Sequence, residues 1–86
     1  MGRGDSIWLD NVMEAFNELG VNPAHRKQIA EKVREIRERK GLHLGNYVAW
    51  TQYVLEHYSR GKSWHDFFHP KRLGSGWWEY LEMEIT

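Results

Sequence analysis

Apolar side chains recur at helical spacing in the first quarter of the chain. Successive members of this stripe are three or four residues apart, which places them on one face of an α-helix: Trp8, Val12, Ala15, Phe16 and Leu19. Asp5 or Ser6 is a suitable N-cap for this helix. Gly20 ends it, because glycine tolerates the left-handed conformation that commonly follows a helix.

A second start signal follows directly at Asn22 and Pro23, since Asn is a good N-cap and Pro suits the first helical position. A narrower apolar stripe comes after it: Ile29, Val33 and Ile36, with Ala30 beside them. Gly41 ends this helix. The remaining positions are mostly charged, so we expect one narrow side of the helix to be buried.

The next segment, residues 42–45, suits a connector or a brief strand. Asn46 then begins a third helix, which we expect to run from Tyr47 to Ser59. The expected core face carries Val48, Thr51, Leu55 and Tyr58. The opposite side carries Ala49, Gln52, Tyr53 and Glu56, with Trp50 and His57 on the flanks.

The last quarter of the chain changes period. Residues 63–69 are rich in aromatic side chains, and residues 77–85 alternate in the manner of a strand. Pro70 and the glycines at 74 and 76 mark a loop between them. We therefore expect a β-hairpin at the C-terminal end.

Three helices followed by a β-hairpin are the layout of a winged helix, an elaborated helix-turn-helix. The predicted fold class is thus α+β, with a flexible N-terminus at 1–5 and a single winged-helix domain at 6–86. The length of 86 residues allows one domain, and the absence of Cys excludes disulfides. Aromatic residues make up 14% of the chain and can build its core.

No apolar run approaches the roughly 20 residues of a membrane span, and the N-terminus lacks the apolar stretch of a signal peptide. We expect a cytoplasmic or nucleoid-associated protein with no membrane partner. The net charge is zero by count, but it is unevenly distributed. Residues 23–72 carry an excess of basic residues, and both ends are acidic, which is a plausible footprint for a polyanionic partner. Ordinary solvated helix faces explain the same charges equally well.

A Phe pair at 67–68 is followed by Gly-x-Gly at 74–76 and by Trp77. Together with several helical segments, this motif resembles the winged-helix domains of restriction–modification proteins, of the HARE-HTH type. Similar modules occur at the termini of restriction endonucleases and in the delta subunit of bacterial RNA polymerase. The resemblance covers about residues 8–81, and its most specific part is a Phe pair followed by Gly-x-Gly and Trp. The segments that carry it are 18–20, 28–33, 46–49, 55–59, 66–68 and 74–78. Thr51, Gln52 and Tyr53 stand where these families often have Arg.

The resemblance implies binding of double-stranded DNA, in restriction–modification or transcription, by the third helix and the hairpin. Gln and Asn pair with adenine in the major groove, so the expected base-contacting residues are Asn46, Gln52, Tyr53 and Glu56. The expected contacts to the DNA backbone, from the second helix, the segment after the third helix and the hairpin tip, are Arg26, Lys27, Arg60, Lys62, Lys71 and Arg72. The alternative is a protein–protein interaction module on the same fold, or self-association.

The sequence shows no constellation typical of an enzyme, and we expect no catalytic residue, cofactor or metal. His65 and His69 lie about 13 Å apart if their segment is a strand, at ~3.3 Å per residue, which is too far to hold one ion. Trp8, Trp64 and the pair 77–78 suit core and hairpin packing. A surface aromatic pocket for a modified or flipped base is a minor hypothesis.

Overall fold

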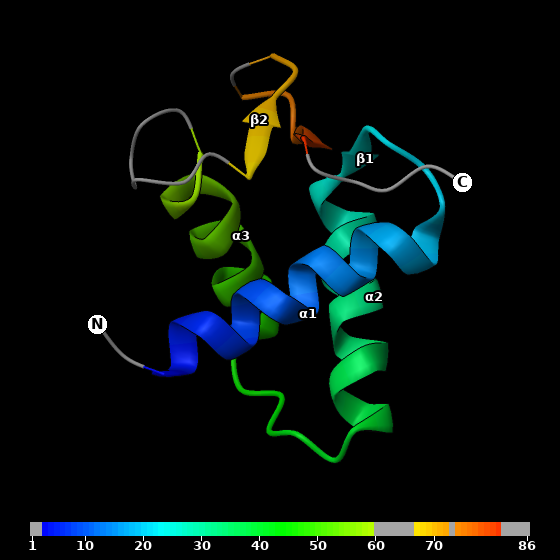
Figure 1. The fold of residues 1–86 in the computed structure, drawn as a ribbon, viewed down its shortest axis with the longest axis vertical. Helices are drawn as coiled ribbons and strands as arrows, with labels where there is room; N and C mark the ends of the chain where they lie inside the picture. Colours follow the sequence, from blue (N-terminus) through cyan, green and yellow to red (C-terminus); the bar gives the residue numbers. More distant parts are fainter. Residues whose placement is uncertain (1–2, 60–66, 73, 82–86) are drawn as a thin grey trace.

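The computed structural model describes residues 3–59, 67–72 and 74–81. They form an α+β arrangement of three helices and a small three-stranded antiparallel sheet, which is compatible with the predicted layout (Figure 1). The elements, in chain order, are α1 (Arg3–Leu19), β1 (Ala24–His25), α2 (Arg26–Arg39), α3 (Tyr47–His57), β2 (Phe68–Pro70) and β3 (Trp77–Tyr80). Figure 1 shows α1 running across both other helices, with β1 and β2 at the opposite end from the α2–α3 connector.

Helix α1 follows the predicted stripe, since Trp8, Val12 and Phe16 are all buried in the core. The helix begins at Arg3, so the predicted N-cap at Asp5 or Ser6 is wrong, because both residues are already helical. Gly20 ends the helix as predicted. Its φ of 70° lies in the left-handed region, and its N–H donates to the carbonyl of Phe16.

The start of α2 differs from the prediction, because the N-cap is His25 and not Asn22. Residues 24–25 form β1 and pair with β3, so the chain is extended where the local signal favours a helix. The Asn22 side chain instead binds the backbone of Tyr80, donating to its carbonyl at 2.8 Å and accepting from its N–H at 3.0 Å. Residues 42–44, where a brief strand was one interpretation, form no regular strand.

Helix α3 begins where the sequence predicts, with the Asn46 side chain accepting from the N–H of Ala49. Its buried face differs from the expected one. Thr51, Val54 and Leu55 are buried, whereas Val48 is 54% exposed. Positions 48 and 55 lie only about 20° apart around a helix that advances about 100° per residue. Val48 is exposed because, in the first turn of α3, it borders an open pocket between α2 and α3.

The hairpin of β2 and β3 is present, and β1 joins it in the order β1-β3-β2. Alternation holds along β3, since Trp78 and Tyr80 are buried while Trp77 is exposed. Phe16 of α1 packs against Phe68 and Tyr80, with ring centroids 5.8 and 5.5 Å away. These aromatic contacts attach the small sheet to the helices, as a hairpin of this size requires. Trp64 and the remainder of the two predicted strands lie outside the described residues.

Candidate functional site

Helix α2 and its C-cap, Lys40, carry seven basic residues, and the structure divides them into two groups. Five of them have partners within the protein: Lys32, Arg34, Arg37, Arg39 and Lys40. Arg26 and Lys27, at the first two positions of the helix, form no ion pair with any described residue. Pairing within the helix therefore accounts for Lys32 and Arg34 alone, and contacts to other parts of the protein account for the other three partnered residues.

The partnered group is held by pairs along α2 and by pairs to α1. Arg34 lies 3.1 Å from Glu31 and 2.9 Å from Glu38, one turn away on either side. Between the helices, Arg39 donates to both carboxylate oxygens of Glu18. This hydrogen bond lowers the pKa of Glu18 and raises the pKa of Arg39. Lys32, Arg34, Arg39 and Lys40 are thus committed to the protein's own carboxylates.

Arg37 is a buried member of the core. Its guanidinium donates to the side-chain oxygen of Asn11 at 2.6 Å and to the carbonyl of His43 at 2.7 Å. Burial lowers the pKa of Arg37, but a guanidinium stays charged in proteins. Arg37 therefore fixes the end of α2 to α1 and to the α2–α3 connector.

The backbone donors at the start of α2 are already used. The N–H of Arg26 donates to the carbonyl of Gly76 at 2.7 Å, and the N–H of Lys27 donates to Nδ1 of His25 at 3.2 Å. A phosphate would therefore meet the side chains of Arg26 and Lys27 rather than these two amides. The side chain of Arg26 also lies beside the hairpin loop, since a Cβ built on Gly76 would come within 3.2 Å of its Nε.

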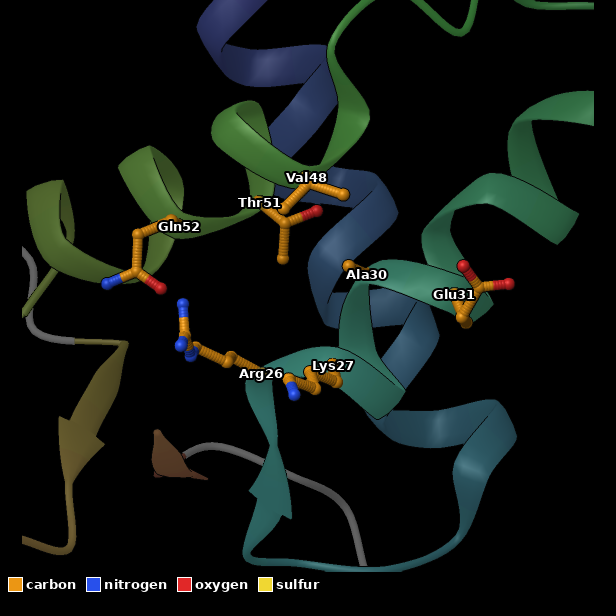
Figure 2. Close-up of a pocket in the computed structure, with 7 residues that line it drawn as sticks. All are labelled: Arg26, Lys27, Ala30, Glu31, Val48, Thr51 and Gln52. Atoms are coloured by element: carbon orange, nitrogen blue, oxygen red, sulfur yellow. The ribbon is translucent and has the colours of Figure 1, made fainter. Parts of the chain in front are cut away.

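A pocket of about 350 Å³ lies between α2 and α3, with Arg26 extending across it toward Gln52 (Figure 2). Its lining consists of Arg26, Lys27, Ala30, Glu31, Val48, Thr51 and Gln52. Two buried polar atoms here, Oγ1 of Thr51 and Oε1 of Gln52, have no hydrogen-bond partner in the described part of the chain. The structure thus brings three predicted site residues, at positions 26, 27 and 52, around one cavity.

The other expected base-contacting residues lie along the outer side of α3. The amide nitrogen of Gln52 donates to Glu56, so these two candidates are bound to each other. Tyr53 is 41% exposed and forms the edge of a shallow apolar hollow of about 340 Å³. This hollow is lined by Asn46, Ala49, Trp50 and Tyr53.

Trp50 is half-buried, because it stacks on Trp8 of α1 with ring centroids 5.4 Å apart and planes 3° apart. Tyr53 meets the edge of Trp50 and stacks on His57. Trp50 therefore contributes both to the core and to the surface, and a continuous aromatic row follows one side of α3.

At the hairpin turn, Lys71 and Arg72 are exposed. Lys71 lies 3.7 Å from Glu79 of β3, whereas Arg72 forms no ion pair with a described residue. Arg60 and Lys62, the other expected backbone contacts, lie outside the described residues. Within the described ranges, no group of three or more His, Asp or Glu side chains is arranged to hold a metal ion.

Sequence patterns missed four residues of the α2–α3 pocket, at positions 30, 31, 48 and 51. Thr51 belongs to the predicted core face and is only 1% exposed, yet its hydroxyl has no partner among the described residues. A hydroxyl-bearing residue on an apolar helix face is the one signal that points to it. Val48 was expected in the core and instead lines the pocket.

No helix among the described residues is long and apolar enough to cross a membrane. No protein-family model, curated protein or solved structure matches the chain.

Proposed function

We propose that the chain is a winged-helix module that binds double-stranded DNA through α3, the start of α2 and the hairpin turn. The order of helices and strands supports the fold, since three helices precede a hairpin and the short β1 extends that hairpin to three strands. The helix before the recognition helix crosses the DNA backbone in helix-turn-helix docking. In this assignment that helix is α2, and α3 enters the major groove.

The observation that carries the proposal is the selective pairing of the basic residues of α2. Protein carboxylates or buried acceptors hold every one of them except Arg26 and Lys27. These two flank α3 at the pocket, where phosphate contacts would be needed. Arg72 is similarly without an ion pair to a described residue at the hairpin turn. Basic side chains without an ion pair to a described residue are suited to bind the phosphates of an external polyanion.

Tyr53 and Val48 are the most exposed large hydrophobic side chains of α3, and we expect them to contact base edges, including thymine methyl groups. Gln52 can reach a base only by exchanging its bond to Glu56. Asn46 is committed to capping α3 through its side-chain oxygen. In this proposal sequence preference depends mainly on positions 48 and 53, and on positions 52 and 56 once their mutual hydrogen bond opens, whereas binding strength depends on the cations.

The test is a fluorescence-anisotropy titration with short duplex DNA, unmodified and methylated, at two salt concentrations. With three cations at phosphates, log Kd should change with log salt by about 0.9 per phosphate neutralised. The double variant Lys71→Glu/Arg72→Glu should weaken binding at low salt. Absence of binding at low salt by a folded sample would overturn the proposal.

A second candidate function, a protein-interaction module, is favoured by the outer side of α3. No Lys or Arg lies between Tyr47 and His57, and exposed Tyr53 lines the shallow apolar hollow together with Ala49 and Trp50. Binding through this side should depend little on salt and should fail in Tyr53→Ala. DNA binding should instead be steeply salt-dependent, so one salt series separates the two functions.

A further inference from the structure

The α2–α3 pocket contains polar atoms that the protein itself leaves unsatisfied. Thr51 is almost completely buried, and its Oγ1 has no hydrogen-bond partner among the described residues. The same is true of Oε1 of Gln52, which can only accept. Burying such atoms without partners costs stability, so they are expected to meet a ligand or water.

The charges around the pocket favour a dianion. Arg26 and Lys27 form no ion pair with a described residue, and Figure 2 shows Arg26 reaching over the cavity toward Gln52. Glu31 is the acidic residue of the lining, and it is bound by Arg34 at 3.1 Å and by the Tyr47 hydroxyl at 3.3 Å. A phosphate monoester carries a charge of about −1.5 to −2 at neutral pH, which matches two unneutralised cations.

The volume of the pocket and its apolar lining residues suit a ligand larger than an inorganic ion. A volume of about 350 Å³ lies in the range of small-molecule pockets, and one water occupies roughly 30 Å³. Ala30 and Val48 supply an apolar wall beside the polar atoms. The complementary molecule therefore has an anionic end, a compact body and a hydrogen-bond donor.

We propose that this pocket binds a small organic monophosphate. The phosphate contacts Arg26 and Lys27, and a donor on the same molecule faces Oε1 of Gln52 and Oγ1 of Thr51. This inference goes beyond DNA binding and is tested without DNA. Because the ligand and a DNA backbone would use the same two cations, bound ligand is expected to compete with DNA.

The first experiment is isothermal titration calorimetry of the full chain with adenosine 5′-monophosphate and ribose 5-phosphate. Inorganic phosphate, adenosine and dimethyl phosphate serve as comparison probes. We expect at least one organic monophosphate to bind at least tenfold more tightly than every comparison probe. If inorganic phosphate bound with the same affinity as the organic monophosphates, Arg26 and Lys27 alone would account for binding, and the inference would be overturned.

Equal binding of dimethyl phosphate would also overturn the inference, because the site would then be a contact for the DNA backbone, as in the proposed function. Loss of DNA binding with retained monophosphate binding would overturn the proposed function alone. The two proposals therefore fail in distinguishable ways.

The second experiment uses variants within and outside the pocket. Thr51→Val removes the unpartnered hydroxyl at nearly constant shape, so affinity for the monophosphate should fall about fivefold while the Tm of the unliganded protein is unchanged or higher. Arg26→Gln should weaken binding roughly tenfold or more. Lys32→Gln, on α2 but outside the pocket lining, should leave affinity unchanged.

A folded Thr51→Val protein with undiminished affinity would contradict the assignment. Should this variant fail to fold, Gln52→Leu provides the same test, since it removes the other unpartnered acceptor. Gln52 is only half-buried, so this substitution disturbs the core less.

Discussion

The guanidinium carbon of Arg37 lies 3.6 Å from the centre of the Trp8 ring, and Trp8 in turn stacks on Trp50. One residue from each of α2, α1 and α3 thus takes part in a single contact series. Arginine over the face of tryptophan is a favourable cation–π arrangement, and it is strongest where water is excluded. This contact series connects the three helices on the side away from the sheet.

Replacing Arg37 by Ala should therefore be strongly destabilising. The change removes the cation–π contact and leaves the acceptors on Asn11 and His43 without their donor. We expect the free energy of unfolding to fall by about 3 kcal/mol, measured by urea denaturation. Arg34→Ala, which removes only exposed and solvent-screened pairs on the same helix, should reduce the free energy of unfolding much less. Similar losses in the two variants would contradict a structural role for Arg37.

The DNA-binding proposal makes a prediction about which basic residues of α2 matter. Arg26→Ala/Lys27→Ala should reduce the log–log salt slope of DNA binding by about 2, because two phosphate contacts are lost. The matched control is Lys32→Ala/Arg34→Ala, which removes the same number and kind of charges from partnered positions. Anisotropy titrations across salt would measure both slopes. A control slope reduced as much as that of the first variant would show a diffuse charge effect instead of a defined contact.

Two glycines of the hairpin loop offer a paired test of local geometry. Both have positive φ, 80° at Gly74 and 86° at Gly76, so alanine is strained at either position by about 1 kcal/mol. A Cβ at Gly76 would also lie 2.7 Å from Nε2 of His25, whereas nothing lies within 4 Å at Gly74. Gly76→Ala should thus be the more destabilising change in thermal or urea unfolding. It should also weaken DNA binding by displacing Arg26, and equal effects of the two variants would contradict this.

Stability should fall on acidification below the ordinary glutamate range. The hydrogen bond from Arg39 lowers the pKa of Glu18, and the hydrogen bond from Lys32 lowers the pKa of Glu35, both from an ordinary value of 4.5. A carboxyl whose pKa is depressed in the folded protein contributes stability that is fully present above its unfolded pKa. That contribution is lost as the pH falls through the folded pKa.

Urea midpoints measured across the acid range would follow this loss. Glu18→Gln should flatten the pH dependence and have little further effect at low pH, where the wild-type carboxyl is already protonated. Because the pairs are exposed, high salt should also reduce the difference. An unchanged pH profile in Glu18→Gln would show that the Arg39 pair contributes nothing.

Local patterns predicted the helices better than the sheet. The stripe from Trp8 to Phe16 and the cap at Asn46 depend only on neighbouring residues, and both are confirmed. The start of α2 depends on a partner more than 50 residues away, because Ala24 pairs with Trp78. The local N-cap signal at Asn22 was therefore overridden by a long-range strand pairing, which the spacing of residues along the sequence does not reveal.

The site was predictable in part for the same reason. Composition and charge identified Arg26 and Lys27. The pairs of Arg39 and Lys40 with α1 became visible only when the two helices were packed together, whereas the pairs of Lys32 and Arg34 lie within α2. The unpartnered hydroxyl of Thr51 is a property of three-dimensional packing. Sequence alone assigned this residue to the core and gave no sign of a cavity beside it.

His25 is the last residue of β1 and the N-cap of α2, and its ring meets the edge of Trp77 on β3. No loop separates β1 from α2, and β1 is paired with β3 of the hairpin. The hairpin and the start of α2 are therefore expected to move together. The hydrogen bond from the Arg26 N–H to the carbonyl of Gly76 also connects the first residue of α2 to the hairpin loop. A displacement of the hairpin turn would therefore also displace Arg26, and a ligand bound to Arg26 would in turn restrict the motion of the hairpin.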